Sequence, residues 1–530
     1  MRIRPGTLFE DAAQRRGQTL VHLDRPFDIA PQGGLTYRIG ELAALVREAS
    51  GWLAAAGVRP GDRVGIVKDN HWDIDVLAYA AVRLGAVPAK IRSNLTPSAI
   101  ETMLRRLEPS LLVTTARCLE SALCDGIDLG GLAKQTLSID RPVGGSLSID
   151  AVRGQPVPPP EDRGDDDPLV VCPTSGTTGI PKLVVHSTNT IIRRLAQFEA
   201  HRYPFFGGRP TDTLASASAF SHGRTFCWTA VALTLTPRNI VIISDQDQAH
   251  AEPLLRVYPP DIFEALPSTF ARWEATATGP HNPFRNVRLY ISTYDAIHPP
   301  AVRTFLEASQ RKHVVFMHGW GQSETGPLAF RLFTRKSLAS KGDRHPTTRN
   351  AGSPTPIKTR LRVVDPTTLR RVPCGTPGVI LARTKALALT YLGEQDRWDG
   401  KVHGAWFNTG DVGTVSRGGV VRLLDREVDA VPGLSCLELE DVIHDRMPDV
   451  VECVLLGAPG RFPLPVVVTK DGTLDAERWR VSTADLPQLD EPVVLSDDQV
   501  PCTGTGKVRR LELRKELGST LVTYGKGTWI

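Results

Sequence analysis

Apolar and polar residues along the first part of the chain follow two alternating patterns. Short apolar runs bounded by turn residues, such as Arg63–Val67 and Ser110–Thr114, predict buried strands. Around them, apolar residues recur at helical spacing in Ile39–Ala56, Trp72–Leu84 and Pro97–Arg106, which predicts helices. Strands that alternate with helices are typical of an α/β domain with a mostly parallel sheet.

The same alternation resumes between positions 187 and 318, and it changes character after position 350. The region 350–424 contains short expected strands separated by Gly and Pro, closer to a small barrel than to βαβ units. After Asp425 the pattern restarts as a compact α+β segment. We therefore predict a large N-terminal α/β domain over 1–424, with a small barrel-like subdomain, and a separate C-terminal domain over 425–530.

Composition and charge exclude several classes of protein. Hydrophobic residues make up 41% and charged residues 23%, as in ordinary soluble proteins. The 63 basic and 58 acidic residues are spread along the chain, which argues against a nucleic-acid partner. No signal peptide or membrane-spanning run is apparent, and the eight cysteines form no C-x-x-C pair. We expect a cytoplasmic protein with reduced thiols and no membrane partner.

A loop rich in Ser, Thr and Gly joins two expected strands, Pro168–Cys172 and Leu183–His186. Its glycines allow a close approach to a ligand, and its hydroxyls and lysine can bind an anion. The residues concerned are Thr174, Ser175, Gly176, Thr177, Thr178, Gly179 and Lys182. The spacing is not that of a P-loop, and the alternative is a plain polar turn. We predict a site for a polyphosphate.

Four further clusters carry chemistry. In His318–Thr325, an aromatic residue (Trp320) can stack on a purine, and a nearby carboxylate (Glu324) can bind Mg²⁺ beside a polyphosphate. In the other three clusters, Asp411 can accept hydrogen bonds from ribose hydroxyls, Arg426 lies at the expected domain boundary, and Lys507 can neutralise charge on phosphorus. Each cluster alone is a weak signal, and their combination is a strong one.

The order and content of these clusters resemble the adenylate-forming superfamily, which comprises acyl- and aryl-CoA synthetases, luciferases and nonribosomal peptide synthetase adenylation domains. The resemblance covers nearly the whole chain. It implies an ATP- and Mg²⁺-dependent ligase that converts a carboxylic acid into its AMP ester, releases pyrophosphate and then transfers the acyl group to CoA or a carrier thiol. It also implies that the small C-terminal domain is mobile.

The resemblance assigns a role to each matching residue. Lys507, Glu324 and Lys182 correspond to catalytic positions, and Glu324 and Thr177 to metal-linked positions. The expected nucleotide contacts are Thr174, Ser175, Gly176, Thr177, Thr178, Gly179, Trp320, Ser323, Asp411 and Arg426.

The acid pocket is expected around His222, Arg224 and Tyr294. His222 and Arg224 are candidates for contacting the carboxylate or a ring substituent of the substrate. Arg224 can equally be a solvated loop residue. Tyr294 can narrow the pocket for a small or flat acid, or it can simply pack in the core.

The identity of the second nucleophile stays open at this point. The segment after Asp429 is shorter than the family's loop that helps to form the thiol tunnel, which puts a CoA step in question. One hypothesis is a ligase for an aromatic or small acid with a thiol acceptor. A second keeps the adenylation and uses an amine, either in amide formation or by activating nitrite for attack by an arylamine. A third is a non-catalytic nucleotide-binding relative.

Overall fold

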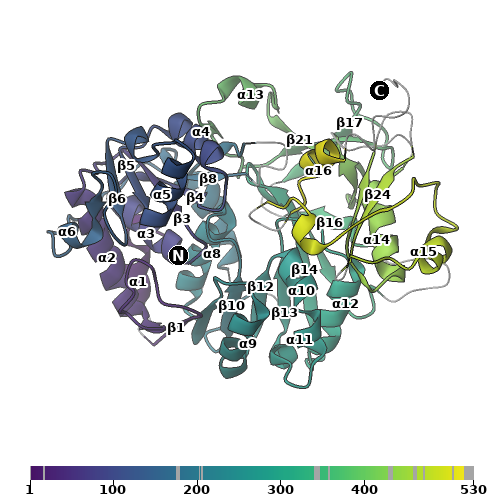
Figure 1. The fold of residues 1–530 in the computed structure, drawn as a ribbon, viewed down its shortest axis with the longest axis horizontal. Coiled ribbons are helices and arrows are strands. Elements are labelled where there is room, and N and C mark those ends of the chain that lie inside the picture. Colours follow the sequence, from purple (N-terminus) through teal and green to yellow (C-terminus); the bar gives the residue numbers. More distant parts are fainter. Residues whose placement is uncertain are drawn as a thin grey trace.

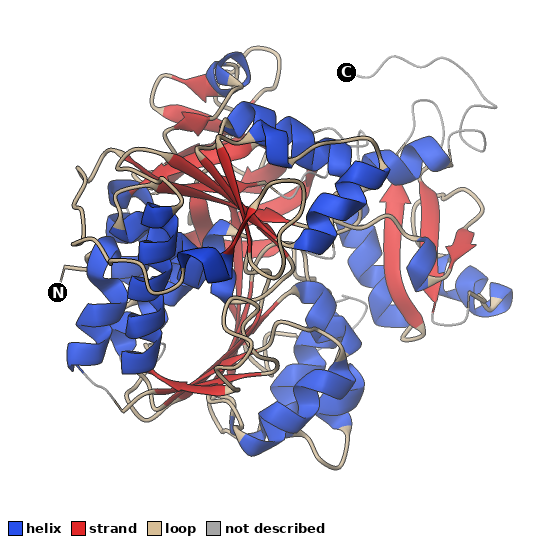
Figure 2. Cartoon of the chain, turned by 60° about the vertical axis from the view of Figure 1, so that its left-hand side comes forward, coloured by secondary structure: helices blue, strands red, loops and turns tan. Residues whose placement is uncertain are grey.

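The structure is a computed structural model in which two large sheets are covered by helices and a smaller sheet follows at the C-terminal end (Figures 1 and 2). It describes residues 2–15, 18–174, 180–201, 203, 207–338, 347–355, 359–427, 434–457, 462–469, 472–503 and 507–517. The α/β class predicted from the alternating pattern is confirmed.

The first large sheet contains eight strands and is parallel through most of its width. Its strands, in spatial order, are β19 (Thr390–Tyr391), β9 (Leu183–Ser187), β8 (Pro168–Pro173), β4 (Val87–Arg92), β3 (Arg63–Lys68), β5 (Leu111–Thr114), β6 (Gln135–Ser138) and β7 (Leu147–Ser148). β8 and β9 pair antiparallel, so the predicted strands on both sides of the Ser/Thr/Gly loop are direct neighbours, and β19 pairs antiparallel with β9 at the edge of the sheet.

The second large sheet contains fourteen strands. Its main path is β17 (Arg360–Val364), β18 (Gly378–Arg383), β21 (Trp406–Val415), β22 (Val421–Arg426), β16 (Asn350–Pro354), β15 (Gly326–Phe333), β14 (Val315–Gln322), β13 (Leu289–Ser292), β12 (Ile262–Ala265), β10 (Thr213–Ala217), β11 (Asn239–Ile242), β1 (Leu20–Leu23) and β2 (Thr36–Arg38). β20 (Val402–His403) pairs with β21 off this path.

The region expected to resemble a barrel is an antiparallel, strand-rich extension of this sheet. The pairings recorded among its described residues form an open path from β17 to β15 rather than a closed ring. The short strands and turns were therefore predicted correctly, whereas their connection to the parallel strands through β14 could not be inferred from local spacing.

The helices cover the sheets because each presents an apolar face. α2 (Ile39–Ala55) buries Leu42, Leu45, Ala49 and Leu53, the positions that predicted it. The other α-helices before position 430 are α1 (Leu8–Arg15), α3 (Asp73–Arg83), α4 (Pro97–Leu107), α5 (Ala116–Cys124), α6 (Ile149–Val152), α7 (Gln197–Glu199), α8 (Gly223–Leu235), α9 (Gln248–Val257), α10 (Pro267–Arg272), α11 (Glu274–Thr278), α12 (Pro299–Ala308) and α13 (Gln395–Asp399). A π-helix, η3 (Thr188–Ala196), precedes α7.

The C-terminal segment has a sheet of its own, which Figure 2 shows beside the main body. Its elements are α14 (Cys436–Arg446), β23 (Val450–Leu456), β24 (Leu464–Thr469), α15 (Ala476–Thr483), β25 (Val493–Leu495) and α16 (Arg510–Glu516). Among the described residues, the buried apolar clusters of this segment share no member with those that precede position 424. Across the described part of the chain, none of the helices combines the length and apolar character needed to cross a lipid bilayer.

Candidate active site

A cavity of about 700 Å³ lies where the carboxyl ends of β13 and β14 meet β21, β22 and the C-terminal segment. All the predicted site residues that the structure describes line this cavity. They are Thr174, Lys182, His222, Arg224, Tyr294, Trp320, Ser323, Glu324, Asp411, Arg426 and Lys507. The structure thus brings these residues to one place, and their individual roles stay predictions.

The Ser/Thr/Gly loop is held at both of its ends. The Thr174 N–H donates to the Lys182 carbonyl oxygen at 2.9 Å, and the Lys182 N–H donates to Thr174 Oγ1 at 3.0 Å. This pairing continues the antiparallel ladder of β8 and β9. The predicted residues between these ends lie outside the described residues. They are Ser175, Gly176, Thr177, Thr178 and Gly179.

Lys182, Glu324 and Tyr391 form a compact group at one side of the cavity. The Tyr391 hydroxyl donates to Glu324 Oε1 at 2.5 Å, and Lys182 Nζ lies 3.5 Å from the same oxygen. Burial acts to raise the pKa of Glu324, but the Lys182 charge and the Tyr391 hydrogen bond outweigh it and the pKa is lowered. Glu324 is therefore ionised at neutral pH, as a magnesium ligand must be.

Two residues of this side were missed by sequence reasoning. Tyr391 is 209 positions from Lys182, yet its ring lies 4.7 Å below the Lys182 ammonium. Lys401 also lines the cavity and donates to the Asn408 carbonyl oxygen at 3.2 Å. Burial, and then the charge of Lys182, lower the pKa of Lys401. No local sequence motif marks either residue. Long-range pairing of β19 with β9 brings Tyr391 here, whereas Lys401 directly precedes β20, which forms a local hairpin with β21.

Asp411 is held between three side chains. Trp320 Nε1 and Gln322 Nε2 each donate to Asp411 Oδ2 at 3.0 Å, and Arg426 Nε lies 3.0 Å from Oδ1. Oδ2 already accepts two hydrogen bonds, whereas Oδ1 faces only Arg426 among the described residues and can still accept from a ligand hydroxyl. The indole of Trp320 is fixed by the same contact, which orients its ring at the cavity wall.

Lys507 reaches the cavity from the C-terminal segment. Its Nζ lies 2.8 Å from Asp295 Oδ1, which follows β13, and both side chains retain some exposure. The Thr503 N–H donates to the Lys507 carbonyl oxygen at 2.7 Å, and the Lys507 N–H donates to Thr503 Oγ1 at 3.1 Å. Lys507 is thus placed by its own segment and faces a carboxylate that a charged ligand can displace.

His222 is the N-cap of α8, a helix that the sequence analysis did not predict. Its Nδ1 accepts the Arg224 N–H at 3.1 Å, and its Nε2 lies 3.4 Å from Ser323 Oγ. Burial, followed by the charge of Lys90, lowers the pKa of His222 to about 3. The imidazole is therefore neutral at physiological pH and can exchange a hydrogen bond without adding a charge.

Arg224 is neither solvated nor free to bind a carboxylate ligand alone. It forms paired hydrogen bonds with Glu264 at 2.7 and 2.7 Å and with Glu199 at 2.5 and 2.7 Å. Glu264 is buried behind it, whereas Glu199 lines the cavity. Burial raises the pKa of Glu264 despite the neighbouring Arg224 charge, so Arg224 joins a buried carboxyl group to the Glu199 carboxylate at the cavity wall.

Tyr294 has an unusual backbone conformation for a large residue, with φ of 81°. Its ring lies 4.6 Å from the His222 ring. Its hydroxyl is turned toward Ser218 but completes no well-formed hydrogen bond among the described residues. The expected narrowing of the pocket is consistent with its place in the cavity wall.

Two buried thiols flank the start of α8. Cys227 lines the cavity, and Cys172 lies at the end of β8, where a Cβ added to Gly223 would meet its sulfur at 2.8 Å. Burial raises the pKa of Cys172 to about 12, and it also raises the pKa of Cys227. The described cysteines form no disulfide.

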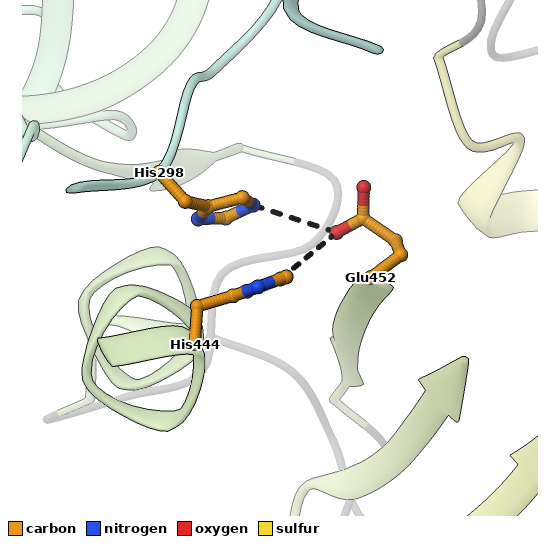
Figure 3. A group of neighbouring side chains, drawn as sticks. All are labelled: His298, His444 and Glu452. Atoms are coloured by element: carbon orange, nitrogen blue, oxygen red, sulfur yellow. Dashed lines mark ion pairs between the residues drawn. The ribbon is translucent and has the colours of Figure 1, made fainter. Parts of the chain in front are cut away.

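A cluster of His298, His444 and Glu452 joins α12 to the C-terminal segment (Figure 3). The two rings stack 3.8 Å apart at 17°, so their in-plane lone pairs run nearly parallel and do not converge on one ion. His298 Nδ1 lies 2.8 Å from Asp441, and its Nε2 lies 3.5 Å from Glu452. Burial acts to lower the pKa of His298, but these carboxylates outweigh it and raise the pKa to about 9.

Known proteins match the chain over most of its length. The model for the AMP-binding enzyme family matches residues 9–392. A 3-amino-2-hydroxy-4-methoxybenzoate diazotase of Streptomyces cremeus is 35% identical over 534 residues, covering 96% of this chain and 95% of that protein. A 3-aminoavenalumate diazotase of a Streptomyces species is 24% identical, covering 90% of this chain and 88% of that protein.

Solved structures share the fold. The anthranilate CoA ligase AuaEII, in complex with anthranoyl-AMP, superposes with a TM-score of 0.80 at 21% identity, covering 98% of each chain. At that identity the likeness supports the fold and says nothing of the ligand.

Proposed function

The chain belongs to the AMP-binding enzyme family, and from this membership we propose which acid it activates and which nucleophile it serves. It is an ATP-dependent adenylate-forming enzyme that produces AMP and pyrophosphate, as the resemblance implied. We propose that the activated acid is nitrite and that the nucleophile is the amino group of an aromatic amine. The observation that carries the proposal is the 35% identity to a diazotase along nearly the entire chain.

The proposed reaction has two steps. A nitrite oxygen attacks the α-phosphorus of ATP, pyrophosphate leaves, and a nitrosyl adenylate forms. The amine nitrogen then attacks the nitrosyl nitrogen, AMP leaves, and the amine loses a proton. The resulting nitrosamine shifts a proton to oxygen and loses water after protonation, which gives the diazonium ion.

We propose that the residues around the phosphates act by electrostatics. Lys507 neutralises charge on the α-phosphorus once the nucleotide replaces Asp295 as its partner. Lys182 binds the departing pyrophosphate. Mg²⁺ is commonly bound by one or two carboxylates together with phosphate oxygens, and the ionised Glu324 fits that requirement. Thr177, the other predicted metal-linked residue, lies outside the described residues.

We propose that Trp320 stacks on the adenine and that Asp411 accepts from the ribose hydroxyls, with Ser323 and Arg426 beside the nucleotide. The contacts among Trp320, Gln322 and Asp411 support this, because they fix the ring and the carboxylate before a ligand arrives. A site ordered in advance loses less conformational freedom on binding.

The far end of the cavity supports an amine as the group recognised there. Its wall contains apolar side chains such as Leu195, Phe198 and Ile291, which suit an aromatic ring. Glu199 is the acidic group of this wall, and Arg224 holds it in place. A carboxylate at this position can accept a hydrogen bond from an amino group.

A second candidate keeps an aromatic carboxylic acid as the activated group, with CoA or a carrier-protein thiol as acceptor. The apolar, ring-sized wall of the cavity is compatible with it. The 35% identity to a diazotase along nearly the entire chain favours the amine instead.

One assay separates the two candidates. Pyrophosphate release is measured with nitrite, with benzoic and aminobenzoic acids, and with each combination, in the presence and absence of CoA. The proposal expects release with nitrite, and conversion of an aminobenzoate to a diazonium ion that a phenol traps as an azo dye. Thioester formation without any nitrite-dependent release would overturn it.

Substitution of Glu199 tests the amine end of the cavity. We expect Glu199→Gln to raise the KM for the arylamine about tenfold, because a charged acceptor is replaced by a neutral amide. The KM for ATP should change little. Glu307→Gln, an exposed position on α12, is the matched control. Equal effects on the KM for amine and ATP would assign Glu199 a structural role.

A further inference from the structure

A second cavity lies outside the site described above. It has a volume of about 350 Å³ and opens at the carboxyl ends of β3 and β4, beside the segment that follows β11. All the side chains that line it are polar or charged. The absence of apolar walls makes it unsuited to an aromatic ring, and its size suits a small hydrated ligand.

Most charges around this cavity are compensated. Lys68 lies 2.6 Å from Asp28 and 2.5 Å from Asp73, and Arg25 lies 2.5 Å from Asp28. Asp69 accepts hydrogen bonds from Ser93 and Arg117. The charges of these groups are therefore balanced by each other, and none of them requires a further counter-ion.

Arg92, the last residue of β4, differs from these residues. Its Nη1 is buried and has no hydrogen-bond partner among the described residues. Burial lowers the pKa of Arg92 to about 10, which still leaves the guanidinium protonated at neutral pH. Asp69, which lines the same cavity, attracts the Arg92 charge, but the buried Nη1 keeps N–H groups from which an anion in the cavity can accept hydrogen bonds.

Tyr294 lies in the wall of the active-site cavity, where its ring contacts His222, and its hydroxyl is close enough to influence the pKa of Arg92. Its hydroxyl completes no well-formed hydrogen bond, and its backbone has a φ of 81°. Strain of this kind in a bulky residue persists where surrounding structure imposes it, often at ligand sites.

We propose that the second cavity is a subsite for a small planar oxyanion, bound by Arg92. A bent anion with two oxygens matches the two parallel N–H groups of a guanidinium. Resting on the proposed function, we identify the anion as nitrite, which Arg92 binds before it reaches the active site. The binding of an oxyanion by Arg92 does not depend on that identification.

Equilibrium binding tests the subsite without turnover. Sodium nitrite is titrated into the full-length protein by calorimetry, with no ATP or amine present, and the titration is repeated with nitrate, formate and bicarbonate. We expect wild-type protein to bind nitrite and Arg92→Gln to bind it at least ten times more weakly. Arg92→Lys, which keeps the charge but loses the paired donors, should fall between them. Arg417→Gln, at an exposed position, is the matched control.

Kinetics and stability complete the test. Arg92→Gln should raise the KM for nitrite at least tenfold and change the KM for ATP and for amine less than twofold. Because the substitution removes an unpartnered buried charge, its melting temperature should equal or exceed that of the wild type. A lower melting temperature with unchanged nitrite affinity would show that Arg92 is structural and would overturn the proposal.

The outcomes also separate this inference from the proposed function. An oxyanion that binds to the wild type and not to Arg92→Gln, in a protein that never turns over nitrite, would uphold the subsite and reject the diazotisation. Nitrite-dependent turnover with nitrite binding that is insensitive to Arg92 would uphold the diazotisation and reject the subsite. Failure of every tested oxyanion to bind the wild type would also reject the subsite.

Discussion

At the scale of single residues, the site is a set of charges whose partners determine what each can do. Lys182 and Lys507 each face a carboxylate, Glu324 and Asp295 respectively. The first pair is buried and closed by Tyr391, whereas the second retains exposure on both sides. A ligand can therefore displace the partner of Lys507 more easily than it can separate Lys182 from Glu324.

Removing the Lys507 ammonium should separate the two half-reactions. We expect Lys507→Ala to lower adenylate formation by a factor of 100 or more, on the order of 3 kcal/mol of barrier, because charge on the α-phosphorus loses its counter-charge. Consumption of a supplied adenylate should continue. Pyrophosphate exchange measures the first step, and AMP release from the adenylate measures the second.

Lys515→Ala, an exposed lysine on α16, serves as the control and should leave both steps unchanged. Equal loss of both steps in Lys507→Ala would contradict the assignment.

At the scale of elements, the local spacing of apolar residues predicted the helices and strands well. It did not predict which of these elements contact one another. Predicted strands such as β3 and β5 and helices such as α2 are present within a few residues of their expected bounds. Their apolar periodicity directly records burial. The start of α8 at Gly223 was missed, because its sequence is apolar on nearly all sides and lacks a helical stripe.

Contacts between elements that are far apart in the chain could not be predicted from the sequence. Arg224 is 25 positions from Glu199 and 40 from Glu264, and no local motif signals that pairing. The approximate location of the site was predicted because its motifs lie at strand ends. The pairing of Arg224 with two carboxylates was not predicted, because it brings together residues of α7, α8 and β12.

The contact between α12 and the C-terminal elements should depend on pH. The pKa of His298 is raised from 6.5 to about 9, so its protonation stabilises the folded state fully below pH 6.5. This contribution is lost as pH rises through about 9, and it amounts to no more than about 3 kcal/mol. The groups that face the ring are Asp441, Glu452 and His444, and Arg349 pairs with Asp441.

We therefore expect the melting temperature of the wild type to fall between pH 6.5 and pH 9 more steeply than that of His298→Gln. His281→Gln, an exposed histidine, should follow the wild type. Scanning calorimetry across this range makes the measurement. Parallel curves for wild type and His298→Gln would show that the ring contributes no proton-linked stability.

At the scale of the whole molecule, we propose that residues 1–424 and 425–530 are separate domains and that the second one moves during the reaction. Apolar clusters of the described residues stop on either side of the junction. Recorded contacts across it include charged pairs, such as Arg349 with Asp441 and Arg303 with Asp445. Polar interfaces of this kind are typical of domains that reorient.

A truncated protein ending at residue 427 tests this division. We expect it to fold cooperatively, with a lower melting temperature because Arg349 loses Asp441, and to bind ATP while forming no adenylate. Calorimetry and pyrophosphate exchange measure the two properties. A truncated chain that is unfolded in the presence of ATP would show that the segments share one cooperative unit.

The low reactivity of the buried thiols beside α8 matters for the proposed chemistry. A nitrosyl adenylate transfers its nitroso group to nucleophiles, and the nucleophilic form of cysteine is the thiolate. Because burial raises the pKa of Cys172 to about 12 and also raises the pKa of Cys227, almost no thiolate exists there at neutral pH. In the proposed reaction, the nitrosyl adenylate therefore does not nitrosate the cysteine that lines the cavity, and the enzyme is not inactivated in this way.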